Sequence, residues 1–252
     1  MIDRASITAK NIAVFGLGKS GISSALALAG YGANVLAWDD NENSRDHAKG
    51  VGISLSDLYA ADWGQIDALI LSPGIPLYHP EPHGVAKLAQ QSGCETIGDI
   101  EILGRVEQDS RFIGITGTNG KSTTTALIGH VLDASGYSIE VGGNLGKPSL
   151  DMKSLGKDGV YVLEMSSYQI DLTPSLAFDA AILLNITPDH LERHGGMDGY
   201  VKAKKAIFAN QGPTHTAVIG VDTEPSHEIY AALQKSRNQT VVPISGNTPV
   251  SG

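Results

Sequence analysis

A glycine-rich loop that ends in a lysine and a hydroxyl residue is the stretch best suited to chemistry. It covers residues 114–125, GITGTNGKSTTT, after a short apolar run at 111–113 and before a segment whose apolar spacing favours a helix. Such a loop holds a nucleoside triphosphate, because glycines let backbone N–H groups crowd round the phosphates at a helix N-terminus. Lys121 is predicted to reach the β- and γ-phosphates, and Ser122 to offer its hydroxyl to Mg²⁺.

The general phosphate-loop pattern is matched only in part. G-x-x-x-x-G-K-[ST] requires glycine at position 115, where this chain has Ile115, and the nearest glycine is Gly114. A glycine-rich turn with a chance GKS is the alternative, and the strand and helix predicted on either side weaken it. The residues predicted to bind ATP are Gly117, Thr118, Asn119, Gly120, Lys121, Ser122 and Thr123.

A second glycine turn lies near the N-terminus. An apolar strand at 11–15 leads into GLGKSG at 16–21, and a second strand at 33–38 ends at Asp39 and Asp40. This spacing is the dinucleotide fingerprint, and taken alone it predicts NAD. The pattern specifies only close approach of the backbone to a phosphate, so any nucleotide diphosphate satisfies it. An NAD-dependent oxidoreductase would also leave the ATP loop unexplained.

Strands and helices alternate along the whole chain. Further strands are predicted at 66–71, 95–97, 138–141, 159–163, 178–184, 216–221 and 240–244, with helices near 85–91, 98–103 and 200–208. This alternation predicts an α/β protein with two mostly parallel sheets, in domains 1–98 and 99–252. The Ser72-Pro73-Gly74 turn at the end of the third strand is either a ligand loop or a simple turn.

Glu164 and His190 each follow an apolar strand, as the ATP loop does. The carboxyl ends of parallel strands share one edge of a sheet, so both side chains are predicted to converge on the phosphates. A carboxylate there would hold Mg²⁺, directly or through water. The residues alone leave open whether His190, beside Asp189, is a metal ligand or structural.

Composition excludes several classes of protein. The net charge of −9 over 252 residues argues against a nucleic-acid partner. A single cysteine, Cys94, permits no internal disulfide and fits a reducing compartment. The chain has no apolar run of membrane-spanning length, and Met1–Arg4 do not begin a signal peptide. We therefore predict a cytoplasmic protein without membrane insertion.

Several motifs together resemble the Mur ligase superfamily. GTNGKST, LEMSSYQ, LNITPDHLERH and the spacing Tyr200-x-x-x-Lys204-x-x-Ile207 follow the order of its central ATP-binding domain. GLGKSG, SPGI and GDIE resemble the Rossmann-like UDP-binding domain of the branch that adds D-glutamate. The resemblance covers roughly residues 11–222 and implies a P-loop ATPase-type second domain, incomplete at its C-terminus.

The resemblance also implies roles for individual residues. Lys121, His190 and Lys204 match catalytic positions, and Lys204 matches a lysine that the family carbamylates with CO₂. Two Mg²⁺ ions would be held by Ser122, Glu164, His190 and the carbamate of Lys204. The positions that match UDP-substrate contacts are Gly18, Lys19, Ser20, Asp39, Asp40, Ser72, Pro73, Gly74, Asn144 and Ser166. Asp40 departs from the family, which often has threonine there.

The implied activity is ATP-dependent addition of D-glutamate to UDP-N-acetylmuramoyl-L-alanine through an acyl phosphate, in peptidoglycan synthesis. The resemblance implies further segments, including a domain that binds D-glutamate, after Gly252, so this chain is expected to be a fragment that is inactive alone. A monomer is expected. Two alternatives are another amino-acid ligase of the superfamily, such as a folylpolyglutamate synthetase, and a non-catalytic nucleotide-binding module.

Overall fold

The computed structural model describes residues 7–250, which form two compact units. The first unit contains the chain up to Val106 with two short later segments, Pro148–Met152 and Leu172–Pro174; the remaining residues form the second. Met1–Arg4, which bear on the signal-peptide prediction, lie outside the described residues. The units divide after Val106 because helix α4 (Asp99–Val106) packs into the core of the first. The domain boundary expected at 98/99 stays a prediction.

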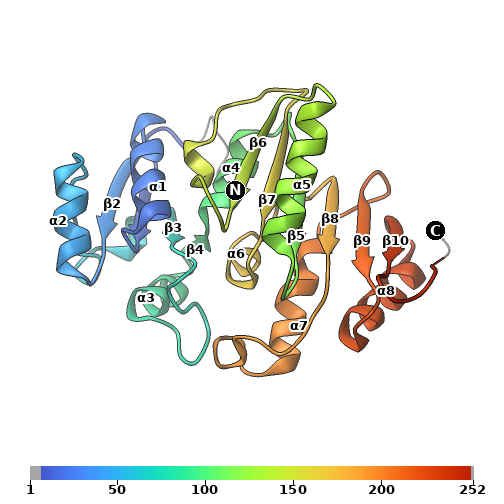
Figure 1. The fold of residues 1–252 in the computed structure, drawn as a ribbon. Helices are drawn as coiled ribbons and strands as arrows, with labels where there is room; N and C mark the ends of the chain where they lie inside the picture. The colour runs from blue at the N-terminus through green and yellow to red at the C-terminus, as the bar shows by residue number, and fades with distance from the viewer. Residues whose placement is uncertain (1–6, 251–252) are drawn as a thin grey trace. The chain divides into compact units, whose positions relative to one another are not determined.

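The first unit is built on a four-stranded parallel sheet in the order β2-β1-β3-β4 (Figure 1). Its strands are β1 (Asn11–Phe15), β2 (Asn34–Trp38), β3 (Ala68–Leu71) and β4 (Glu95–Ile97). Its other helices are α1 (Lys19–Gly30), α2 (Glu42–Gly50), α3 (Gly84–Ser92), η1 (Trp63–Gln65) and η2 (Ser149–Asp151). Strand β1 pairs with both β2 and β3, so the carboxyl ends of these three strands lie side by side.

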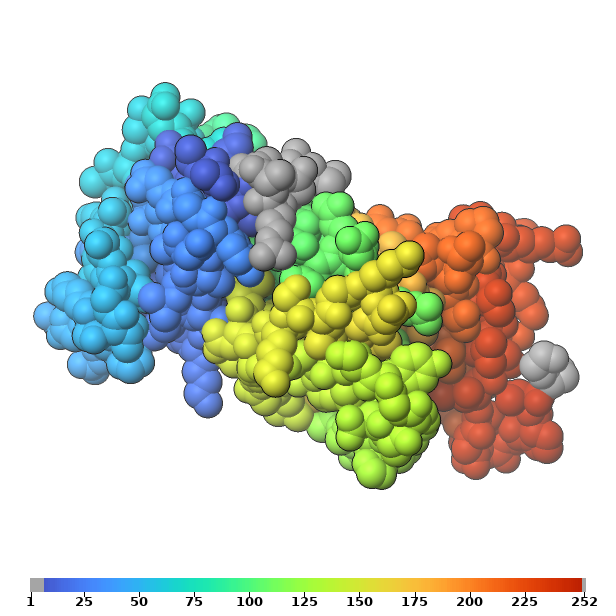
Figure 2. Space-filling view, turned by 90° about the horizontal axis from the view of Figure 1, so that it is seen from above, coloured from blue at the N-terminus to red at the C-terminus, as the bar shows by residue number. Residues whose placement is uncertain are grey.

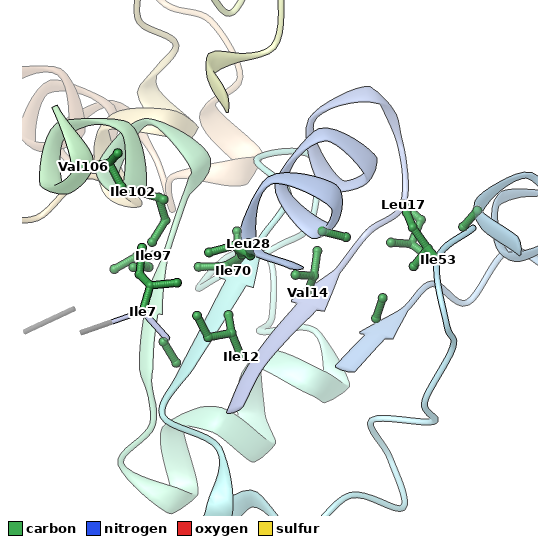
Figure 3. Close-up of a cluster of buried hydrophobic side chains, with 14 residues drawn as sticks. Ile7, Ile12, Val14, Leu17, Leu28, Ile53, Ile70, Ile97, Ile102 and Val106 are labelled. Carbon is green, nitrogen blue, oxygen red and sulfur yellow. The ribbon is translucent and has the colours of Figure 1, made fainter. Parts of the chain in front are cut away.

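Both faces of this sheet are buried. Ile12 and Val14 of β1 pack in one cluster that also contains Leu28 of α1 (Figure 3). Their neighbours Ala13 and Phe15 pack in a second cluster with residues of α3. Successive side chains of a strand point to opposite faces, so a strand covered on both sides is apolar throughout. This burial explains why β1 was recognisable as a continuous apolar run.

The second unit is built on a six-stranded parallel sheet in the order β10-β9-β8-β5-β7-β6. Its strands are β5 (Arg111–Thr116), β6 (Ile139–Gly143), β7 (Val160–Glu164), β8 (Ala180–Leu183), β9 (Thr216–Gly220) and β10 (Thr240–Ile244). Its helices are α5 (Lys121–Ala134), α6 (Ser167–Asp171), η3 (Leu191–Arg193), α7 (Met197–Lys205), η4 (Ala206–Phe208) and α8 (Glu224–Ser236). The predicted α/β class with parallel sheets is confirmed.

Helix α5 packs along β5, β7 and β6 (Figure 1). Ile128 and Leu132 contact the core cluster that contains Ile115 and Val162. The opposite face of α5 lies at the surface, as the yellow-green region of Figure 2 shows, and Leu127 is 59% exposed there. The packing places Lys121, the first residue of α5, close after the carboxyl end of β5. Within residues 7–250, no helix is long and apolar enough to cross a membrane.

Candidate functional site

The loop between β5 and α5 has a backbone that depends on glycine. Gly117 has φ 156° and Gly120 has φ 86°, a region that L side chains rarely adopt. A Cβ atom at Gly117 would also lie 3.0 Å from Cβ of Leu184. The two glycines therefore let the loop turn tightly against the segment that follows β8.

Hydrogen bonds from that segment hold the loop in place. The backbone N–H of Thr118 donates to the carbonyl of Asn185 at 3.0 Å, and the N–H of Asn119 donates to Oδ1 of Asn185 at 2.9 Å. The hydroxyl of Thr118 donates to the carbonyl of Thr187 at 3.0 Å. Sequence reasoning gave Asn185 no role; the available signal was its position just after an apolar strand.

Two lysines from different helices meet on one carbonyl group of the loop. Nζ of Lys121 donates to the carbonyls of Gly117 and Thr118, each at 2.9 Å. Nζ of Lys204, from α7, also donates to the carbonyl of Gly117 at 2.9 Å. The structure thus brings Lys204 to the predicted phosphate loop, although it is distant in sequence.

Lys204 is buried, with 2% of its surface exposed. Burial, and to a lesser extent the nearby charge of Lys121, together lower the pKa of its amine from the ordinary 10.5 to about 7. The ring of Tyr200 faces the amine, with 4.7 Å between Nζ and the ring centroid. At neutral pH a large fraction of Lys204 is therefore an uncharged, nucleophilic amine.

Glu164, the last residue of β7, has a buried carboxylate of which only one oxygen accepts a hydrogen bond from the described part of the chain. Its Oε1 accepts a hydrogen bond from Nδ2 of Asn144 at 2.7 Å, whereas Oε2 is buried with no hydrogen-bond partner among residues 7–250. Glycine at position 143 lets the end of β6 lie close to Glu164, because a Cβ atom there would lie 2.3 Å from the carbonyl oxygen of Glu164. A buried carboxylate oxygen without a donor fits a hard divalent cation.

The other predicted metal residues are more exposed. The His190 side chain is 54% exposed, and its Nε2 lies 3.5 Å from Oδ2 of Asp189. Ser122 is exposed in the first turn of α5. Among the described residues, no cluster of three His, Cys, Asp or Glu could hold a metal by itself. A cation at Glu164 therefore needs further oxygen ligands, such as the Ser122 hydroxyl and nucleotide phosphates.

Ser166 forms hydrogen bonds with a residue close to it in sequence. Its hydroxyl donates to Oε1 of Gln169 at 2.9 Å, and it accepts from the N–H of Gln169 at 3.2 Å. Asn144 and Ser166 belong to the second unit, whereas the other predicted UDP-substrate residues belong to the first. The predicted substrate contacts are thus divided between the two units.

In the first unit, the predicted UDP residues gather where three strands end. The hydroxyl of Ser72, after β3, donates to the carbonyl of Gly16 at 2.7 Å. The N–H of Leu17 donates to Oδ2 of Asp39, after β2, at 2.6 Å. Gly18, the residue just before α1, provides no side-chain cap, which leaves the first N–H groups of the helix available to an anion. Lys19 and Ser20 form the first turn of α1, and Pro73 and Gly74 continue the loop after Ser72.

Asp40 has two partners that the sequence did not predict. Its Oδ2 accepts from the hydroxyl of Tyr59 at 3.0 Å and lies 3.1 Å from Nε2 of His83. Burial and the bond to Asp40 raise the pKa of Tyr59 to about 12. The departure from the family pattern is therefore accommodated by neighbours outside the predicted site, and neither neighbour belongs to a recognisable motif.

A parallel sheet whose middle strand leads through a glycine loop and a lysine into a helix defines a nucleotide-binding unit of the P-loop type. The first unit adds a Rossmann-like sheet with its own glycine turn. The chain belongs to the Mur ligase family: residues 115–250 match the Mur ligase middle domain, and residues 10–98 match the Mur ligase MurD-like N-terminal domain.

Curated relatives and a solved structure agree with this assignment. The chain is 50% identical over 242 residues to a UDP-N-acetylmuramoylalanine–D-glutamate ligase of Caulobacter vibrioides, covering 94% of this chain and 51% of the relative. It is 49% identical to the same ligase of Rhodospirillum rubrum, covering 94% of this chain and 50% of the relative. The fold is similar to the UDP-N-acetylmuramate:L-alanyl-gamma-D-glutamyl-meso-diaminopimelate ligase of Neisseria meningitides, with a TM-score of 0.59, 16% identity and coverage of 94% and 78% of the two chains. The chain spans about half the length of the curated relatives it matches.

Proposed function

We propose that this chain forms the UDP-substrate-binding and ATP-binding parts of a ligase that joins D-glutamate to UDP-N-acetylmuramoyl-L-alanine. Identity of about 50% to ligases with this name supports the choice of substrates. The observation that carries the chemistry is the meeting of two lysines on the carbonyl of Gly117, within a loop built for phosphate. That the protein is a cytoplasmic monomer stays a prediction.

The reaction would proceed in two transfers. An oxygen of the substrate carboxylate attacks the γ-phosphorus of ATP, and ADP leaves, which gives an acyl phosphate. The amine of D-glutamate then attacks the acyl carbon, phosphate leaves, and the amine loses a proton. Lys121 would bind the phosphates and offset the charge that develops on them, and the chain need not supply a nucleophilic side chain.

A divalent cation fits beside Glu164. Oε2 of Glu164 would hold it directly or through water, while Asn144 fixes the other carboxylate oxygen, and Ser122 would contribute its hydroxyl. The cation would neutralise phosphate charge and align the transferred group. His190 is the proposed ligand of a second cation, and its half-exposed ring lies against Tyr168.

Lys204 would act as a carbamate. The unprotonated amine attacks the carbon of CO₂, an N–C bond forms, and one proton is released. Burial supports this reaction, because it holds the pKa of Lys204 at about 7 and so keeps much of the amine unprotonated. The carbamate would replace a buried cation beside Lys121 with an anion, and supply oxygens suited to Mg²⁺.

The decisive experiment measures phosphate release by the full-length protein with ATP, Mg²⁺ and UDP-N-acetylmuramoyl-L-alanine. D-Glutamate is expected to stimulate release, whereas L-glutamate and L-alanine are not. Equal stimulation by another amino acid would overturn the proposed substrate. In a second arm, calorimetry on residues 1–252 compares UDP-N-acetylmuramoyl-L-alanine with NAD; tighter binding of NAD would overturn the role given to the Gly16–Gly21 turn.

A further inference from the structure

His194 is a buried polar residue that the proposed chemistry does not use. It lies between η3 and α7, and its side chain is 3% exposed. Nε2 lies 2.8 Å from the hydroxyl of Ser167, and Nδ1 lies 3.8 Å from Oδ2 of Asp171. The order Ser–His–Asp resembles a hydrolytic triad, but Ser167 is only 3% exposed, so no substrate reaches its hydroxyl. The imidazole is therefore held in place and takes no part in nucleophilic chemistry.

Two tyrosines from different helices pack on this imidazole. Tyr168 of α6 stacks on it, with ring centroids 5.3 Å apart and planes 9° apart. Tyr200 of α7 lies against it at 5.4 Å and 48°. Aromatic contacts of this geometry add to the stabilisation that burial provides. His194 thus joins the segment after β7 to the helix that carries Lys204.

Each tyrosine extends the contact to a proposed site residue. The ring of Tyr168 lies 5.6 Å from the ring of His190. The hydroxyl of Tyr200 lies 3.2 Å from the hydroxyl of Thr118 in the phosphate loop, and its ring faces the amine of Lys204. His194 is therefore one aromatic ring away from His190, from Lys204 and from the loop.

Within the described part of the chain, few contacts other than that with Tyr168 restrain the side chain of His190. It is half exposed, and its backbone is left-handed, with φ 48°, which is uncommon for a residue other than glycine. Among the residues that the structure describes, its side chain lies near the carboxylate of Asp189 and the ring of Tyr168. Tyr168 is in turn clamped by His194 and by the Arg193 guanidinium, 4.6 Å from the ring centroid. The orientation of His190 therefore depends on a ring that His194 fixes.

We propose that His194 is a positioning residue that, through Tyr168 and Tyr200, orients His190 and Lys204 towards a nucleotide-bound divalent cation. This inference rests on the proposed function. Residues that fix the ligands of a metal typically change metal affinity by about 10–100-fold when they are removed. A residue that only fills the core would instead change stability and leave the dependence of ATP binding on Mg²⁺ unaltered.

The test measures ATP affinity of residues 1–252 by calorimetry, with and without Mg²⁺, in His194→Phe, Tyr168→Leu and the double variant. His194→Phe keeps a ring against Tyr168 but loses the bond to Ser167, and the part-exposed Tyr168 offers a second route should His194→Phe fail to fold. His227→Ala, an exposed histidine on α8, is the matched control.

Each single variant is expected to lower ATP affinity about 10-fold or more with Mg²⁺, and less than about 2-fold without it. The double variant is expected to lose no more than the larger single effect, because both substitutions act on one chain of contacts: His194→Phe releases the ring from Ser167, and Tyr168→Leu removes the ring that contacts His190. Unchanged Mg²⁺-dependent affinity in the folded variants, equal losses without Mg²⁺, or additive losses would overturn the inference. Failure of the unsubstituted chain to bind ATP would instead overturn the proposed function, and this inference with it.

Discussion

Replacing Lys204 with methionine is expected to stabilise the second unit at neutral and acidic pH. Burial lowers the pKa of the amine from 10.5 to about 7. One pKa unit corresponds to about 1.4 kcal/mol, so the buried ammonium costs the folded state up to ~5 kcal/mol. Methionine has a similar length and no charge, and the carbonyl of Gly117 keeps its bond from Lys121. Allowing for the lost hydrogen bond and the contact with Tyr200, we expect a net gain of ~2–4 kcal/mol.

The gain in stability from Lys204→Met should decrease as the pH rises. Below about pH 7, Lys204 is protonated in both the folded and unfolded states, so the full cost of burial is present. Between about 7 and 10.5 the folded state has lost the proton while the unfolded state retains it, so the stability of the unsubstituted protein rises with pH. The advantage of Lys204→Met should therefore be largest near pH 6 and shrink steadily towards about pH 10.

Urea unfolding in CO₂-free buffer can measure this difference for each unit separately. Trp38 and Trp63, the only tryptophans of the chain, both lie in the first unit, so their fluorescence reports that unit alone. Circular dichroism also detects unfolding of the second unit. In Lys204→Met, only the unfolding transition of the second unit should shift, to higher urea concentration. Lys205→Met, at an exposed neighbour, is the matched control. Equal stability of Lys204→Met and the unsubstituted protein near pH 6, or a gain that grows with pH, would refute the argument.

Two further predictions concern the same pair of lysines. In ¹³C-labelled bicarbonate with ATP and Mg²⁺, the unsubstituted chain should show a carbamate resonance that Lys205→Met retains and Lys204→Met loses; its persistence in Lys204→Met would place the modification elsewhere. Lys121→Ala should weaken ATP binding on the order of 10–100-fold, because a charged hydrogen bond to phosphate is lost. UDP-substrate binding at the Gly16–Gly21 turn should change little in that variant, and a comparable loss there would contradict the assigned role.

Strands were predictable from the sequence because the sheets are buried. Strands β1, β3 and β7 are covered on both faces and form continuous apolar runs. Helices α2 and α8 were not predicted. Only Ala48 of α2 is buried, so this helix shows no apolar stripe, and its start depends on Asn41, whose side chain accepts from two backbone N–H groups. Such a polar helix is visible in sequence only through its cap.

The site was predictable as a set of positions but not as a set of contacts. Parallel strands place their carboxyl ends on one edge, which is why Glu164 and the phosphate loop could be assigned to the same region. The partner that each side chain contacts depends on packing between segments that are distant in sequence. The bond from Asn144 to Glu164, the anchoring of the loop by Asn185 and the burial of His194 all arise in this way.

Burial of Lys204 explains both its cost to the stability of the folded protein and its proposed reaction with CO₂. An ordinary lysine, with a pKa of about 10.4, is almost fully protonated at neutral pH and reacts poorly with CO₂. Burial and the charge of Lys121 destabilise the ammonium form, and the same effect supplies the unprotonated amine. A substitution that relieves the buried charge must therefore remove the reactive group as well. Lys204→Met should be more stable and unable to carry the carbamate, which is the trade-off expected where a site stores an unfavourable charge for its function.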